Sequence, residues 1–160
     1  MEGRTIALPM ADADAFDDAE FLGLSRSSKR DPYRLGLLAR HFEMGERATA
    51  QLPIAGGTLV ITDRRLLVFT THLEVDGAWN VREFHGYVVS KEIPLEEIQD
   101  VCHSTTKGPR EVVDQLQITT RGGNVDLVVS RGLQRVVSDE DLALVVRLVT
   151  RRSPTPGRAS

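Results

Sequence analysis

Short apolar segments follow one another along this chain between residues 48 and 129, and turn residues separate each segment from the next. Residues 58–62 and 66–70 are rich in β-branched and aliphatic side chains, which favour strands, and only three polar residues lie between them. Further turn signals stand at Gly56-Gly57, Asp76-Gly77 and Gly122-Gly123. Because no helix alternates with these segments, the sequence predicts a mainly β sandwich or barrel of about seven antiparallel strands.

The predicted strands cover residues 48–52, 58–62, 66–70, 78–93, 101–103, 113–118 and 125–129. Gly86 is expected to bend the fourth strand, and the polar residues 104–110 are expected to form a loop. Leu59, Ile61, Leu67 and Phe69 stand at alternating positions of their strands, so we expect these four side chains to point into the core.

One helix is predicted on each side of the strands. The first covers residues 31–45, where Asp31 caps the start and Pro32 takes the first helical position. The second covers residues 139–151, begins with a Ser138–Asp141 cap and carries an apolar stripe. We expect this C-terminal helix to close an open end or seam of the barrel.

The ends of the chain lack apolar periodicity. Residues 1–30 carry an acidic stretch and then a basic one, which predicts a flexible tail with at most a weak helix near residues 15–22. Residues 153–160 are predicted to be a disordered tail. The main domain is therefore expected to span residues 46–152. A single cysteine, no signal peptide and no apolar run of about 20 residues predict a cytoplasmic protein.

The formal net charge is only −3, from 20 basic and 23 acidic residues. A dedicated nucleic-acid binder usually has a strong basic excess, because neutralising phosphates drives its affinity. The composition therefore argues against a nucleic-acid partner.

Residues 57–69, with the sequence GTLVITDRRLLVF, resemble the bacterial PH-like and GRAM-like domains. In that family a glutamate precedes the first strand, as Glu46 does here, and an Ile-Pro-Leu-x-x-Ile segment follows, as residues 93–98 do here. The resemblance covers residues 46–151. It implies a PH-like barrel closed by a C-terminal helix.

The resemblance also implies a binding function. Many eukaryotic PH domains bind phosphoinositides through basic residues in the loop that joins their first two strands, but the matching loop here, residues 53–57, has no cation. We therefore expect a module that binds a protein partner or self-associates. A free strand edge of such a barrel could accept a peptide strand. The alternative is peripheral binding to anionic lipid at the inner membrane face.

Several residues are candidates for such contacts, and each has a structural alternative. A basic cluster for anionic lipid would contain Lys107, Arg110 and Arg121, which as ordinary loop charges would simply be solvated. Trp79 could anchor an interface or be a half-buried strand residue. Arg64 and Arg65 either solvate the turn or pair with a carboxylate, and the alternative is that they contact a partner at an interface. Arg151 and Arg152 either complement the helix dipole or contact a partner.

The sequence offers little for catalysis. Cys102 and His103 are adjacent, and neighbouring strand residues point to opposite faces, which does not suit a thiolate–imidazole pair. The four histidines lack the spacing of a metal site, and no glycine-rich phosphate loop is present. We therefore expect neither an enzyme nor a cofactor or metal site.

Overall fold

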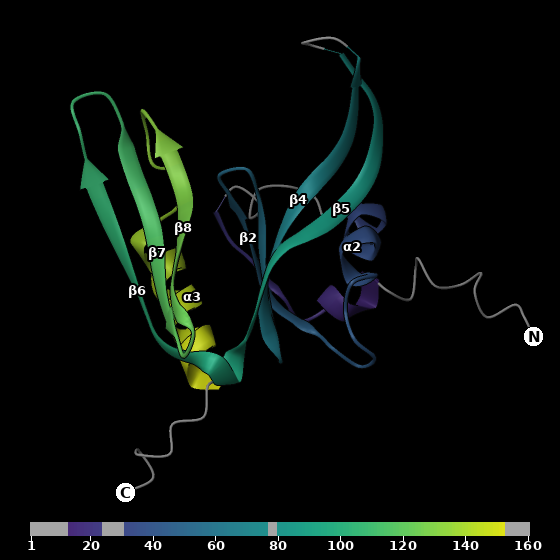
Figure 1. Cartoon of the computed structure of the whole chain (residues 1–160), viewed down its shortest axis with the longest axis horizontal. Coiled ribbons are helices and arrows are strands. Elements are labelled where there is room, and N and C mark those ends of the chain that lie inside the picture. Colours follow the sequence, from purple (N-terminus) through teal and green to yellow (C-terminus); the bar gives the residue numbers. More distant parts are fainter. Residues whose placement is uncertain (1–12, 24–30, 77–79, 153–160) are drawn as a thin grey trace, which may run out of the picture.

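The computed structural model describes residues 13–23, 31–76 and 80–152, and the side chains of all these residues except 72–85 and 151–152. Two sheets, two α-helices and two short 3-10 helices make up this part of the chain (Figure 1). The elements are η2 (Asp14–Phe16), β1 (Glu20–Phe21), α2 (Pro32–Ala39), β2 (Ala48–Ile54), β3 (Gly57–Thr62), β4 (Arg65–Asp76), β5 (Asn80–Pro94), η4 (Leu95–Glu97), β6 (Ile98–Lys107), β7 (Val112–Thr120), β8 (Gly123–Gly132) and α3 (Asp139–Arg152).

The strands form a five-stranded sheet, β1-β2-β3-β4-β5, and a three-stranded sheet, β6-β7-β8. Strands β2 to β8 pair antiparallel with their neighbours within each sheet, whereas the two-residue β1 pairs parallel with β2. The predicted seven antiparallel strands and the C-terminal helix are therefore confirmed.

Most strands are longer than predicted, and β4 and β6 exceed their predicted bounds the most. The predicted loop at residues 104–110 is mostly strand, because β6 continues to Lys107 and pairs with β7 along its whole length. Its exposed face needs no apolar residues, so the polar composition of this segment did not reveal the strand. Likewise β4 pairs with β5 as far as Asp76, well beyond its pairing with β3, which ends at Phe69. The two strands therefore continue as a ribbon that projects from the sheet (Figure 1).

The main core lies between the two sheets and α3. The apolar stripe of α3 enters it through Leu142, Val145 and Val149, which are all fully buried. Ser138 caps this helix by accepting a hydrogen bond from the Asp141 amide (3.0 Å), as the sequence predicted. From the five-stranded sheet, the inward side chains are those of Ala50, Leu52, Leu59, Ile61, Leu66, Val68 and Ile93.

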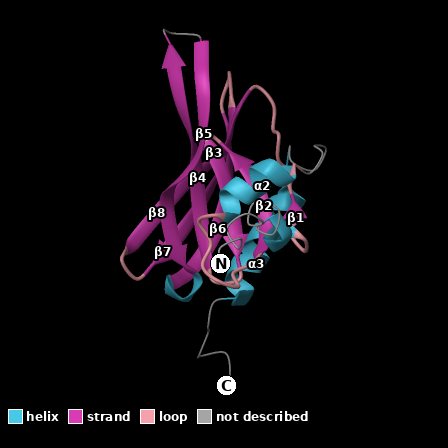
Figure 2. Cartoon of the chain, turned by 90° about the vertical axis from the view of Figure 1, so that its right-hand side faces the viewer, coloured by secondary structure: helices cyan, strands magenta, loops and turns pink. Residues whose placement is uncertain are grey.

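A second core covers the other face of the five-stranded sheet. Its members are Ala13, Phe16, Leu35, Leu38, Ala39, Ala48, Val60, Leu67 and Phe69. The helix α2 and residues 13–21 form the layer that covers this face (Figure 2). Leu67 and Phe69 therefore face α2, not the main core as predicted, because this sheet is buried on both faces.

The predicted N-terminal tail is wrong for residues 13–23. Phe16 and Leu22 are fully buried, one in each core. The strand β1 pairs with β2, and the Leu22 amide donates to the Gln51 carbonyl (2.9 Å). Burial of these two large side chains is worth several kcal/mol, about 1.5–3 for each, which offsets the entropy of ordering a short polar segment. Residues 1–12, 24–30 and 153–160 lie outside the described residues.

The helix α2 begins as predicted but ends at Ala39, six residues early. Asp31 caps it by accepting hydrogen bonds from the Tyr33 and Arg34 amides. The Arg40 amide closes its last turn on Gly36. The chain then turns back toward β2, and Phe42, predicted on the helix, stacks on Phe16 with ring centroids 5.5 Å apart.

Candidate functional site

A buried ion pair joins the start of β2 to the start of β4. Arg65 donates from Nε to Glu46 Oε2 (2.9 Å) and from Nη2 to Glu46 Oε1 (2.8 Å), a two-point contact. The same guanidinium reaches Glu92 on β5 (2.8 Å) and the His41 carbonyl (2.8 Å) after α2. Thr62 completes the network by donating to Glu46 Oε2 (2.6 Å). This network therefore connects four segments of the fold.

The charges of this network stabilise one another. Burial alone would raise the pKa of Glu46, but hydrogen bonds from Arg65, Thr62 and the Glu43 amide outweigh burial and lower it. The hydrogen bond to Glu46 is the main reason that the pKa of Arg65 lies above its usual value. Both groups are therefore ionised at neutral pH and hold the fold together.

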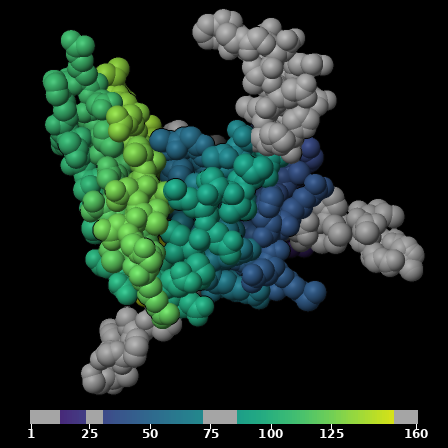
Figure 3. All heavy atoms as spheres, viewed as in Figure 1, coloured from purple at the N-terminus to yellow at the C-terminus, as the bar shows by residue number. Residues whose placement is uncertain are grey.

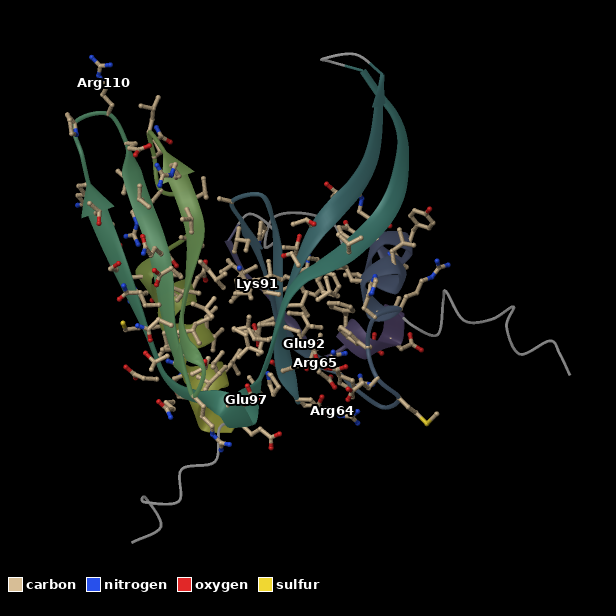
Figure 4. The ribbon with its side chains drawn as sticks, in the orientation of Figure 1. Arg64, Arg65, Lys91, Glu92, Glu97 and Arg110 are labelled. Atoms are coloured by element: carbon tan, nitrogen blue, oxygen red, sulfur yellow. The ribbon has the colours of Figure 1, made fainter. Side chains whose placement is uncertain are left out.

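The structure separates the two arginines of the turn. Arg65 is only 8% exposed and its donors are used inside the network, so the interface alternative is wrong for it and the predicted carboxylate pairing is confirmed. Arg64 is half exposed and pairs with Glu43 (3.3 Å), an exposed contact of small energetic value. Figure 4 shows both side chains at the edge between α2 and the five-stranded sheet.

The predicted basic cluster does not form. Lys107 and Arg110 flank the turn between β6 and β7, where Arg110 projects from the end of the hairpin (Figure 4). Arg121 follows the other end of β7, and its amide donates to the Glu97 carbonyl (3.2 Å). The nine residues of β7 separate the two ends by about 30 Å. Only Lys107 and Arg110 can therefore act on the same ligand.

A second ion pair fixes the connection between β8 and α3. Arg135 donates from Nε and Nη2 to the two carboxylate oxygens of Asp114 (3.1 and 2.7 Å), which is fully buried on β7. Its Nη2 also reaches Thr105 on β6 (3.3 Å) and Asp139 at the start of α3 (2.8 Å). The connection, residues 133–138, is therefore anchored at its centre.

This connection forms one wall of a groove on the surface, which we call the β2–β8 groove. It has a volume of about 520 Å³ and is lined by Pro53, Ile54, Ala55, Val129, Ser130, Arg131, Gly132, Leu133, Gln134 and Val136. Most of this lining is apolar. Leu133 is 83% exposed and Val136 is 44% exposed, although both are large hydrophobic residues. An exposed apolar groove of this kind is typical of a binding surface.

The two walls of the groove are held together at its base. The Ala55 amide, at the tip of the β2–β3 hairpin, donates to the Val128 carbonyl on β8 (3.1 Å). Figure 3 shows the yellow-green atoms of β8 beside the blue atoms of this hairpin. Above that hydrogen bond β8 continues to Gly132. The groove therefore lies where the two sheets separate, and it is framed by regular strands rather than by loops alone.

The remaining candidates contribute less. Trp79 and the side chains of Arg151 and Arg152 lie outside the described residues and side chains. Cys102 is exposed, and its thiol contacts Gln117 (3.6 Å) on β7. Within the described residues, no group of three or more His, Cys, Asp or Glu could hold a metal ion, and no helix is long and apolar enough to span a bilayer.

The arrangement of strands β2–β5 and β6–β8 followed by α3 is the one that the sequence resemblance implied. The chain has a PH-like fold. No protein-family model and no curated protein matches its sequence. Among solved structures, it is similar to the crystal structure of a pleckstrin homology domain from Shewanella amazonensis SB2B. That similarity has a TM-score of 0.47 and 13% identity, and covers 71% of this chain and 92% of that chain.

The sequence analysis missed the residues of the groove. Leu133 and Val136 lie in a segment without periodicity, between the last strand and the last helix, so no pattern singled them out. Pro53 was recognised only as an interruption of a strand. One signal in the sequence could have indicated the groove. Leu133 and Val136 are large apolar residues in a connection between two elements, where polar, solvated side chains are usual.

Proposed function

We propose that this chain is a non-catalytic binding module that docks a protein partner in the β2–β8 groove. The observation that carries this proposal is the exposure of Leu133 and Val136 beside an apolar groove of about 520 Å³. Apolar side chains at this position gain free energy only when a partner removes them from water.

The frame of the groove supports the same function. Arg135 and the Ala55–Val128 hydrogen bond hold the two walls in place before a ligand arrives. A preformed site loses less conformational entropy on binding than a flexible loop does. The groove can therefore contribute affinity even though it is small.

Anionic lipid is the competing ligand, and the charges favour it less. Lys107 and Arg110 share one end of the three-stranded sheet, while Arg121 lies at the other. Arg131, which lines the groove, pairs with Glu111 (3.1 Å). Two cations near a membrane supply about 2 kcal/mol, which physiological salt weakens further.

The test uses a photo-crosslinking amino acid at position 133 of the full chain in cells of its source organism. Met44 is 95% exposed, lies between α2 and β2 and does not line the groove, so it provides the matched control position. We expect a discrete protein adduct from position 133 and none from position 44. Equal adduct patterns from the two positions would argue against docking in the groove.

A second measurement separates the two ligand classes. The purified chain is sedimented with neutral and anionic vesicles at low and physiological salt. We expect no binding at physiological salt. Binding to anionic vesicles that persists there, and that Lys107→Ala with Arg110→Ala abolishes, would replace the protein-binding function with a lipid-binding one.

A further inference from the structure

Among the residues that the structure describes, none pairs its backbone with the outer edge of β8 above the base of the β2–β8 groove. The strand is the last of its sheet and pairs with β7 on one side only. On its other side the Val128 carbonyl accepts the Ala55 amide. Within the described part of the chain, residues 129–132 make no backbone hydrogen bond on that outer side. Unpaired backbone at a strand edge is a template for a further strand.

The opposite wall of the groove cannot serve as such a template. Pro53 on β2 has no amide hydrogen, and proline in a sheet takes positions where its nitrogen faces away from the ladder. Earlier along β2, the edge is already used by β1 at Ala50 and Gln51. Of the two walls, only β8 therefore offers both donors and acceptors to an incoming backbone.

The dimensions and the lining of the groove suit an extended segment. The four residues 129–132 span about 13 Å, enough to pair with a short strand. Alternate side chains of an added strand point to the same side, so every second one would meet the apolar lining formed by Ile54, Leu133 and Val136. Main-chain hydrogen bonds between β8 and the added strand would supply affinity, and the apolar lining would favour an apolar side chain on that strand.

We propose that β8 at residues 129–132 accepts an extended peptide of the partner protein as an added strand, with an apolar side chain of the peptide in the β2–β8 groove. This inference rests on the protein-binding function proposed above. It specifies the partner as an unfolded or terminal segment with apolar residues at alternate positions, rather than as a folded surface.

The test begins with selection from a displayed library of random nine-residue linear peptides, using the full chain as bait. The selected peptides are then titrated against the parent chain, Leu133→Asp and the control Met44→Asp. Both replaced residues are exposed apolar side chains, so both variants should keep the parent melting temperature. We expect Leu133→Asp to weaken binding at least tenfold and Met44→Asp to change it less than twofold.

Main-chain pairing is tested separately by N-methylating each peptide position in turn. In an added strand only alternate amides face β8, so we expect loss of binding at every second position. We also expect slower hydrogen exchange in the complex at those amides of residues 129–132 that point away from β7. If Leu133→Asp lowers the melting temperature, Leu133→Ala replaces it in the titrations.

Each remaining outcome overturns the inference in a different way. Sensitivity to Leu133→Asp without sensitivity to N-methylation would exclude strand addition and keep the protein-binding function. Peptides that bind Leu133→Asp as well as the parent, or a library that yields no binder, would exclude a peptide in this groove. In those two cases the photo-crosslinking experiment at position 133 still tests the protein-binding function independently. Concentration-dependent self-association that Leu133→Asp abolishes, with no peptide bound, would assign the groove to a second copy.

Discussion

Arg65 contacts Glu46 through two hydrogen bonds of 2.8 and 2.9 Å, although the two residues are separated by the whole β2–β3 hairpin. These are the glutamate before the first strand and an arginine of the turn through which the sequence resembles PH-like domains. Their contact gives that resemblance a structural meaning. The motif fixes the position of the hairpin against β4.

Replacing Arg65 by alanine should leave the Glu46 carboxylate buried without its partner. We expect the free energy of unfolding to fall by about 3–5 kcal/mol, measured by urea denaturation at neutral pH. Arg64→Ala is the matched control, because its pairing with Glu43 is exposed, and we expect a change below about 1 kcal/mol. Equal losses for the two variants would contradict the role assigned to the buried pair.

The pKa of Glu46 predicts how stability depends on pH. It lies below the ordinary value of 4.5, so Glu46 contributes stability above pH 4.5 and loses that contribution as the pH falls through its folded-state pKa. Glu46→Gln removes this titration. The stability difference between the parent and Glu46→Gln should therefore be largest at pH 7 and shrink below pH 4.5, as urea denaturation across this range would show. A difference that stays constant would exclude Glu46 as the titrating group.

Phe16→Ala should test the second core. This fully buried side chain stacks on Phe42 and packs over the sheet with α2, so we expect a loss of about 3–5 kcal/mol. Glu20→Ala, an exposed change in the same segment, should stay within about 0.5 kcal/mol. Thermal unfolding of both variants provides the measurement. An unchanged melting temperature for Phe16→Ala would restore the prediction of a flexible tail.

Arg135→Ala should disturb the wall of the β2–β8 groove as well as the fold. Asp114 would remain fully buried with only the Thr105 hydroxyl as a partner, which we expect to cost about 3–5 kcal/mol. Arg131→Ala removes an exposed pair nearby and should cost less than about 1 kcal/mol. Denaturation compares the two. A similar effect of both changes would mean that Arg135 does not anchor this connection.

The strands and the last helix were predictable because their signals are local. The turn at residues 63–65 and the stripe of α3 each follow from a few neighbouring residues. The burial of both sheet faces was also visible in principle, since Leu66-Leu67-Val68-Phe69 is an unbroken apolar run where a strand with one wet face would alternate. Its covering layer was not visible, because Phe16 stands almost alone among acidic residues.

The positions of the basic residues required a different kind of reasoning. Arg110 and Arg121 are close in the sequence, but they stand at opposite ends of one strand, and counting the residues of β7 would have separated them. The groove depends on the angle at which the two sheets diverge, and no local sequence pattern predicts that angle. Long-range geometry therefore limited the prediction of the site more than residue chemistry did.

The second core has a practical consequence for where this domain begins. A fragment cloned from Glu46, the boundary suggested by the family resemblance, would keep every antiparallel strand but expose Val60, Leu67 and Phe69 on the uncovered sheet. Copies of such a fragment would associate through this exposed apolar surface, and the fragment would aggregate. A recombinant fragment should therefore include Ala13 and all residues that follow it, because Ala13 and Phe16 belong to the cover of that surface.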